Sequence, residues 1–189
     1  EIYQCDWSSD VCSSDLHKQS IFPWKAYQKE KISIDEYNRQ MSDHRTKGVA
    51  IICGAVSENL EVIDVDTKYE TYDLWDAISK AIPEHIYKKL HIVNTKSNGK
   101  HLIYRCEYIE GNKKLALRYA NNDELAKNPH NKSLCIIETR GEGGYVVAPP
   151  TDGYTILQDG INVLTIDERE ALMEVMASFN EVIEEVVIR

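Results

Sequence analysis

The chain lacks the features of several large classes of protein. Its 189 residues include five cysteines and no Cys-x-x-Cys pair, so the sequence predicts no disulfide framework and favours a reducing cytoplasm. No apolar run approaches the roughly 20 residues that a transmembrane helix needs. Basic residues number 22 against 31 acidic ones, which argues against a protein that coats DNA nonspecifically. An enzyme that touches nucleic acid through one local patch is still compatible with this charge.

Residues 1–16 differ in character from the rest of the chain. The stretch DWSSDVCSSDL at 6–16 resembles the in-frame translation of a sequencing-library adapter, so we expect 1–16 to be non-native and the natural start of the domain to be missing. The alternative is a native surface segment rich in Ser and Asp. Without the four acids of residues 1–16, which include no Lys or Arg, the net charge is −5 rather than −9. The remaining residues, about 173, suffice for one domain with its own core.

Apolar periodicity and turn residues predict an α+β domain. Ser33 and Thr165 open capping boxes of predicted helices, and the amphipathic stretch 70–82 predicts another that ends before Pro83. The turn at 54–59 predicts a hairpin between the first two strands, whereas 107–132 gives no clear prediction. Because hairpins and crossovers are mixed, an α+β sheet fits better than a purely parallel one. The predicted strands are 49–53, 60–66, 91–94, 101–105, 134–138 and 145–148.

Two aspartates one residue apart end the apolar run at 60–66. Successive side chains of a strand point to opposite faces, so Asp64 and Asp66 share a face while Ile63 and Val65 point into a core. Adjacent carboxylates repel each other unless a proton or a cation neutralises them, and oxygen ligands suit Mg²⁺ or Mn²⁺. The pair therefore predicts a metal site, although a solvated strand end is the alternative.

Two further groups of polar residues lie at predicted strand ends. Ser97, Lys100 and His101 surround a glycine turn whose backbone amides offer donors to a phosphate; the alternative is that His101 lies on the surface. Glu138 and Arg140 share a face at the end of an apolar strand, just before the glycine-rich turn 141–144. There the alternative is a hairpin turn with an exposed ion pair.

In this order, the three motifs resemble the archaeo-eukaryotic primase superfamily, and most closely the bifunctional primase–polymerase (Prim-Pol) domain of phages, plasmids and mobile elements. The resemblance covers about residues 22–155, with supporting stretches at 23–28, 48–66, 111–116 and 138–150. It implies a catalytic sheet resembling an RNA-recognition fold, with a smaller α/β unit at its N-terminal side. We expect an N-terminally truncated catalytic domain at 17–165, and a C-terminal helix at 166–189 that leads to a missing downstream region.

The resemblance also implies roles for individual residues. Asp64, Asp66 and Glu138 would hold two Mg²⁺ or Mn²⁺ ions. The triphosphate of an NTP or dNTP would contact His101 and Ser97, with Lys100 and Arg140 as further donors. Some relatives carry a zinc element, but the spacing of Cys106, His130 and Cys135 does not suit one, so we predict no structural zinc. Candidate DNA contacts, equally a solvated polar face, are Lys96, Arg105, Lys113, Lys114 and Arg118.

The implied activity is synthesis or extension of primers on single-stranded DNA by two-metal nucleotidyl transfer. A replicative helicase, fused to the chain or acting in trans, would be its partner. Two other classes use the same residues: a two-metal nuclease or other phosphotransferase, and a noncatalytic replication module that binds DNA or a helicase. The sequence leaves these alternatives open.

Overall fold

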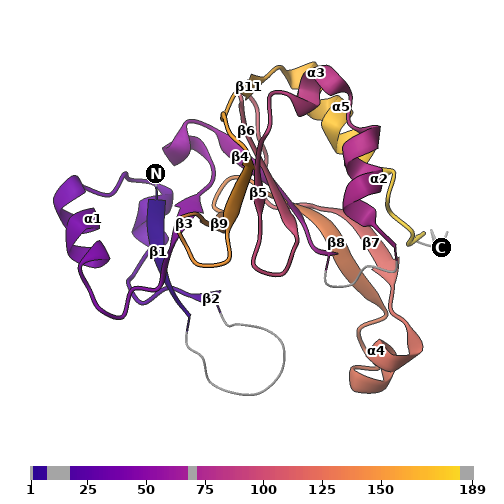
Figure 1. Cartoon of the computed structure of the whole chain (residues 1–189), viewed down its shortest axis with the longest axis horizontal. Helices are drawn as coiled ribbons and strands as arrows, with labels where there is room; N and C mark the ends of the chain where they lie inside the picture. Colours follow the sequence, from indigo (N-terminus) through magenta and orange to yellow (C-terminus); the bar gives the residue numbers. More distant parts are fainter. Residues whose placement is uncertain (1, 8–17, 68–71, 184–189) are drawn as a thin grey trace, which may run out of the picture.

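The computed structural model describes residues 2–7, 18–67 and 72–183, and the strands of this part of the chain form two sheets. Helices α2 (Leu74–Ala81), α3 (Glu84–Tyr87) and α5 (Ile166–Ala177) cover one side of the larger sheet. The smaller sheet and α1 (Ile34–Met41) lie on its other side (Figure 1). This mixture of helices and antiparallel strands is the α+β class that the sequence predicts.

The larger sheet has the strand order β10-β5-β6-β4-β8-β7, and a short strand, β11, pairs with β6. Its centre is β4 (Leu60–Val65), which pairs antiparallel with β6 (Lys100–Cys106) on one side and β8 (Ser133–Arg140) on the other. The outer strands are β5 (His91–Asn94), β7 (Lys114–Tyr119), β10 (Thr155–Gln158) and β11 (Val163–Leu164). Every predicted motif therefore lies on or beside the three central strands.

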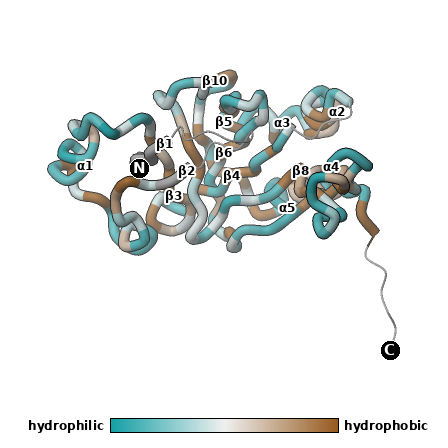
Figure 2. Tube along the Cα trace, turned by 90° about the horizontal axis from the view of Figure 1, so that it is seen from below, coloured by the Kyte–Doolittle hydropathy of each residue, from teal (hydrophilic) through white to brown (hydrophobic). Residues whose placement is uncertain are grey.

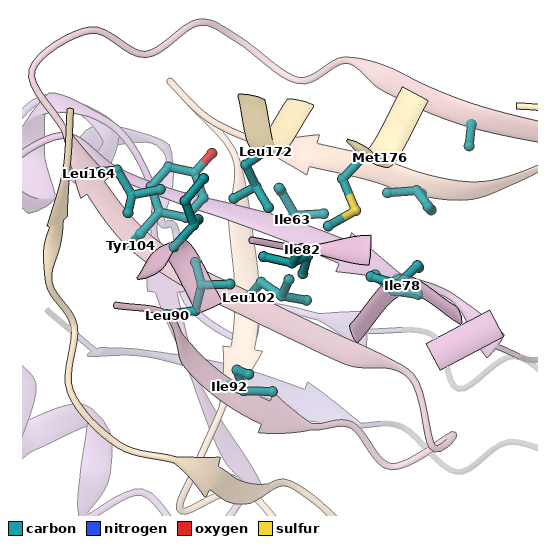
Figure 3. Close-up of a cluster of buried hydrophobic side chains, with 14 of the residues drawn as sticks. Ile63, Ile78, Ile82, Leu90, Ile92, Leu102, Tyr104, Leu164, Leu172 and Met176 are labelled. Atoms are coloured by element: carbon teal, nitrogen blue, oxygen red, sulfur yellow. The ribbon is translucent and has the colours of Figure 1, made fainter. Parts of the chain in front are cut away.

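The main hydrophobic core fills the space between the larger sheet and its helices (Figure 3). Ile63 of β4 and Leu102 of β6 contribute from the sheet, and Ile78 of α2 and Leu172 of α5 contribute from the helices. All four are fully buried, and each such side chain stabilises the fold by about 1.5–3 kcal/mol relative to an exposed one. Because alternate residues of a strand point to opposite faces, this packing directs Val62 and Asp64 to the face without helices.

The smaller sheet has the order β2-β1-β3-β9 and adjoins that second face. Its strands are β1 (Ile2–Trp7), β2 (Lys18–Gln19), β3 (Gly48–Ile52) and β9 (Tyr145–Ala148). Val146 and Val147 of β9 pack with Val62 and Ile103 of the larger sheet in a second core cluster. Seen from below, the mostly hydrophilic α1 lies at one end of the molecule and α2 at the other, with the sheets between them (Figure 2). Strand β1 lies within residues 1–16 and pairs with β3.

The predicted hairpin between the first two strands is wrong. β3 pairs with β1 and β9, whereas β4 belongs to the larger sheet, and only an isolated bridge joins Gly54 to Leu60. Gly54 has a φ of 106°, and the 3-10 helix η2 (Ala55–Ser57) follows it. The Glu142 carboxylate accepts a hydrogen bond from the Ala55 amide at 2.7 Å. This contact fixes the point at which the chain crosses from one sheet to the other.

The other predicted elements largely agree with the structure. Ser33 and Thr165 cap α1 and α5 as predicted. α5 ends at Ala177, earlier than the helix predicted at 166–189, and its Leu172 is buried in the main core. Residues 107–132, which gave no prediction, contain β7 and α4 (Asn122–Lys127). The start of the helix predicted at 70–82 lies outside the described residues, and α2 begins at Leu74. Within the described part of the chain, no helix is long and apolar enough to cross a membrane.

Candidate active site

Asp64 is the centre of a polar site that spans three neighbouring strands. The register places Asp64 of β4 directly opposite His101 of β6 and directly opposite Glu138 of β8. The His101 Nε2 atom is 3.6 Å from Asp64 Oδ1. All three residues lie on the face without helices, because the alternate residues Ile63 and Val65 are buried in the main core. The motifs, which are far apart in sequence, therefore meet at one place.

Arg140 provides the positive charge beside these carboxylates. Its Nη2 atom donates a hydrogen bond to Glu138 and is 3.9 Å from Asp64 Oδ2. Burial raises the pKa of the Glu138 carboxyl; Arg140 opposes this shift, while the nearby Asp64 and Asp66 charges add to it. The site therefore concentrates more negative charge than one arginine neutralises, and an additional cation would favour the ionised form of Glu138.

A small cavity of about 110 Å³ lies beside Asp64, His101 and Arg140, and residues 145–147 of β9 form its other wall. Its volume corresponds to a few water molecules at about 30 Å³ each. His101 is only 2% exposed, and its ring lies 6.0 Å from the ring of Tyr154. His101 is thus a buried side chain at the floor of the site, not the surface residue of the alternative interpretation.

The segment after β4 joins the first two motifs. The Asp66 amide donates to the Ile136 carbonyl at 2.9 Å, which holds half-buried Asp66 beside β8. The Thr67 hydroxyl donates to the carbonyl of exposed Ser97 at 3.3 Å, which ties the predicted phosphate-binding turn to the strand end. A Cβ at Gly99 would lie 2.5 Å from the Val65 carbonyl oxygen, so only glycine allows the turn to approach β4 this closely.

Lys100 faces away from the other predicted phosphate ligands. It precedes His101 on β6 and therefore lies on the opposite face, where its Nζ is 5.5 Å from the centre of the Trp75 ring. Lys100 also donates a hydrogen bond to the Asn98 carbonyl at 2.7 Å. It lines a second, larger cavity of about 570 Å³. The structure brings Asp64, Glu138, His101 and Arg140 together, but not Lys100.

The five candidate DNA contacts do not form one patch. Exposed Lys114 lies opposite Glu138 in the sheet, beside the site, and Lys96 lies on the 95–99 turn. Lys113 is paired with Glu110, and Arg105 lies at the other end of β6 with its Nε 3.6 Å from a Glu58 carboxylate oxygen. Arg118 is 5% exposed and donates two hydrogen bonds to Glu124, whose pKa this pairing lowers to about 2. That placement does not support a DNA contact by Arg118.

The carboxylates fit a hard divalent cation by their chemistry. Asp64 and Glu138 face each other across two paired strands, and both present oxygen ligands, which Mg²⁺ and Mn²⁺ prefer. Among the residues that the structure describes, however, no three His, Cys, Asp or Glu side chains are grouped closely enough to be metal ligands. The contact that the two carboxylates share is Arg140.

Behind the site lies a buried network that the sequence analysis missed. Glu61 of β4 is 0% exposed and points to the helix side of the sheet, where Arg169 of α5 donates two hydrogen bonds to it, at 2.6 and 2.9 Å. The Tyr104 hydroxyl donates a third at 2.6 Å. The network clamps α5 to the strand that carries Asp64. Its two charged members are 108 residues apart in sequence, so local sequence patterns do not predict this ion pair.

Comparison with protein families identifies the family of the chain. Residues 13–174 match the family described as bifunctional DNA primase/polymerase, N-terminal. The match covers most of the 189 residues, so the chain belongs to this family, and a DNA primase or polymerase is its general class of activity. DNA and nucleotides are accordingly its expected ligands. No curated protein matches the chain.

Proposed function

We propose that the chain is a DNA-dependent nucleotidyltransferase that makes or extends primers on single-stranded DNA. The observation that supports this best is the placement of Asp64 between Glu138 and His101 on three adjacent strands. Asp64, Asp66 and Glu138 would hold Mg²⁺ or Mn²⁺. When bound, such ions activate the attacking 3′-hydroxyl and stabilise the charge of the leaving pyrophosphate.

The remaining residues of the site would bind and orient the nucleotide. His101 lies at the floor of the small cavity, and a phosphate there would receive a hydrogen bond from its imidazole. Ser97 and free amides of the 95–99 turn, which Thr67 ties to the end of β4, would donate to further phosphate oxygens. Lys114, beside Glu138, would meet the DNA backbone.

Arg140 would help to position the nucleotide. Its guanidinium contacts the Glu138 and Asp64 carboxylates. The planar set of donors that it presents is also suited to a phosphate oxygen of the nucleotide.

The test is an extension assay on a primed single-stranded template, with and without dNTPs, in Mn²⁺ or Mg²⁺. A polymerase lengthens the primer only when dNTPs are present. Shortening of the DNA without dNTPs would assign the site to a nuclease instead. DNA binding with neither reaction would indicate a noncatalytic module. A replicative helicase, fused or in trans, is the partner that we propose from the family resemblance.

A further inference from the structure

We propose that the second cavity, on the helix side of the larger sheet, binds one unpaired nucleotide of the single-stranded DNA. The inference rests on the proposed function and adds a DNA subsite to it. The cavity measures about 570 Å³ and is lined by Thr67, Tyr72, Asp73, Trp75, Asn98 and Lys100. Sites for small organic ligands typically measure about 300–1,000 Å³, so a base with its sugar and phosphate has enough room.

The lining combines the groups that recognise a nucleotide. Tyr72 is 47% exposed and offers aromatic surface for stacking a base, while Trp75 packs against the main core and lines the cavity beside it. Lys100 is 8% exposed, and its ammonium lies 5.5 Å from the Trp75 ring centre and donates a hydrogen bond to the Asn98 carbonyl at 2.7 Å. It therefore gives the cavity wall a positive charge that would attract the phosphate of a stacked base. Proteins that bind single strands use this combination of aromatic platforms and cations.

The acidic member of the lining does not oppose this assignment. Asp73 caps α2, and its carboxylate accepts a hydrogen bond from the Asp76 amide at 2.9 Å. Asn98 and Thr67 supply neutral polar groups for the edge of a base. A base stacked on Tyr72 with its edge facing these groups would be unpaired, because its hydrogen-bonding edge would already be occupied.

The cavity is held in a fixed position relative to the candidate active site. The turn at 95–99 is closed by hydrogen bonds from Thr95 N to Gly99 O and from Asn98 N to Thr95 O, at 2.9 and 3.0 Å. The same turn carries Lys100 toward the cavity and His101 toward Asp64 on the opposite face. A DNA strand that crosses the ends of β4 and β6 would therefore place one base in the cavity next to the nucleotide that reacts.

The first test compares two tyrosines by the anisotropy of a labelled oligodeoxythymidine. Tyr72→Leu removes the proposed stacking surface, whereas Tyr108→Leu makes the same change at a residue of similar exposure, 54%, beyond the opposite end of β6. Loss of one stacked base should weaken single-stranded DNA binding about fivefold to a hundredfold in the Tyr72 variant. The Tyr108 variant should bind as wild type does. Equal affinities for the two variants would overturn the proposal.

The second test measures the salt dependence of the same binding. Lys100→Gln should reduce the slope of log K against log salt by about 0.7, which is the contribution of one phosphate contact to a single strand. Lys88→Gln removes the same charge from an exposed lysine next to α3 and should leave the slope unchanged. A Lys100 slope equal to that of wild type would refute the phosphate contact.

The outcomes also separate the subsite from the reaction. Weaker dNTP binding with unchanged DNA binding in Tyr72→Leu would assign the cavity to the incoming nucleotide and overturn the DNA subsite. Primer extension by wild type together with unaltered DNA binding by both variants would reject the cavity and leave the proposed function intact. Absence of extension by wild type would instead reject the proposed function.

Discussion

Replacing Arg169 by methionine should destabilise the protein more than any surface substitution. Arg169 is 5% exposed, and it supplies two of the three hydrogen bonds that the fully buried Glu61 accepts. Methionine preserves much of the side-chain volume but removes the charge and both donors. The Glu61 carboxylate would then keep only one hydrogen-bond donor, the Tyr104 hydroxyl, inside a core that excludes water.

The size of the effect follows from the burial of both partners. Removing one member of a buried ion pair costs about 3–5 kcal/mol, because the remaining charge is left uncompensated. A domain of this size loses roughly 2–4 °C of melting temperature per kcal/mol, so we expect Arg169→Met to melt about 6–20 °C below wild type. The matched control is Arg39→Met. It breaks a pair with Glu36 in which the arginine side chain is 62% exposed, and such a pair contributes little because water and salt screen it.

Thermal unfolding followed by circular dichroism measures this difference. The double variant Glu61→Met/Arg169→Met should recover much of the loss, because it leaves no buried charge without a partner. If Arg169→Met and Arg39→Met melt within 2 °C or so of each other, Arg169 does not clamp α5 to β4. A double variant that melts lower than the single one would show that methionine fits this space poorly.

Two further predictions concern ligands. His101→Ala should weaken nucleotide binding about tenfold to a hundredfold, which corresponds to the loss of one charge-assisted hydrogen bond, while the affinity for DNA stays unchanged. Isothermal titration measures both affinities. An unchanged nucleotide affinity would show that His101 has a structural role only. Either Mn²⁺ or a dNTP at a hundredfold excess over its Kd should raise the melting temperature by about 5–11 °C, and the two ligands together should raise it by more than either alone. Asp64→Ala should lose this synergy and, without metal, melt no lower than wild type, because the Asp64 charge raises the pKa of the half-buried Glu138 carboxyl. Equal responses of the variant and wild type would place the metal elsewhere.

Strand alternation predicted the face on which each motif lies, and the family resemblance grouped the three motifs into one site. Asp64 and Glu138 end apolar runs whereas His101 begins one, and the structure places all three on one face of three adjacent strands. Alternation also sends Lys100 to the opposite face from His101, although the two were grouped by sequence proximity. Local motifs thus identify the polar residues at strand ends, and the alternation of side chains along each strand determines which of these residues lie on the same face.

The features that the sequence analysis missed depend on contacts between distant segments. Arg118 was counted as a surface cation, but α4, in the region without a prediction, brings Glu124 against it. The hairpin prediction failed because Gly54 turns the chain into the other sheet, a choice stabilised by Glu142, which lies 87 residues from its partner Ala55. Neither contact has a periodic signal in the sequence.

The most direct test of the central claim is primer extension by isosteric variants of the candidate ligands. Asp64→Asn and Glu138→Gln keep the shape of each side chain but remove the charge that would hold a divalent cation. Asp76→Asn and Glu84→Gln make the same changes at exposed carboxylates paired with lysines. We predict that the first two lose extension by several orders of magnitude while keeping their circular dichroism spectra, and that the controls extend primers at the wild-type rate. Wild-type extension by Asp64→Asn and Glu138→Gln would contradict the assignment of this face as the active site.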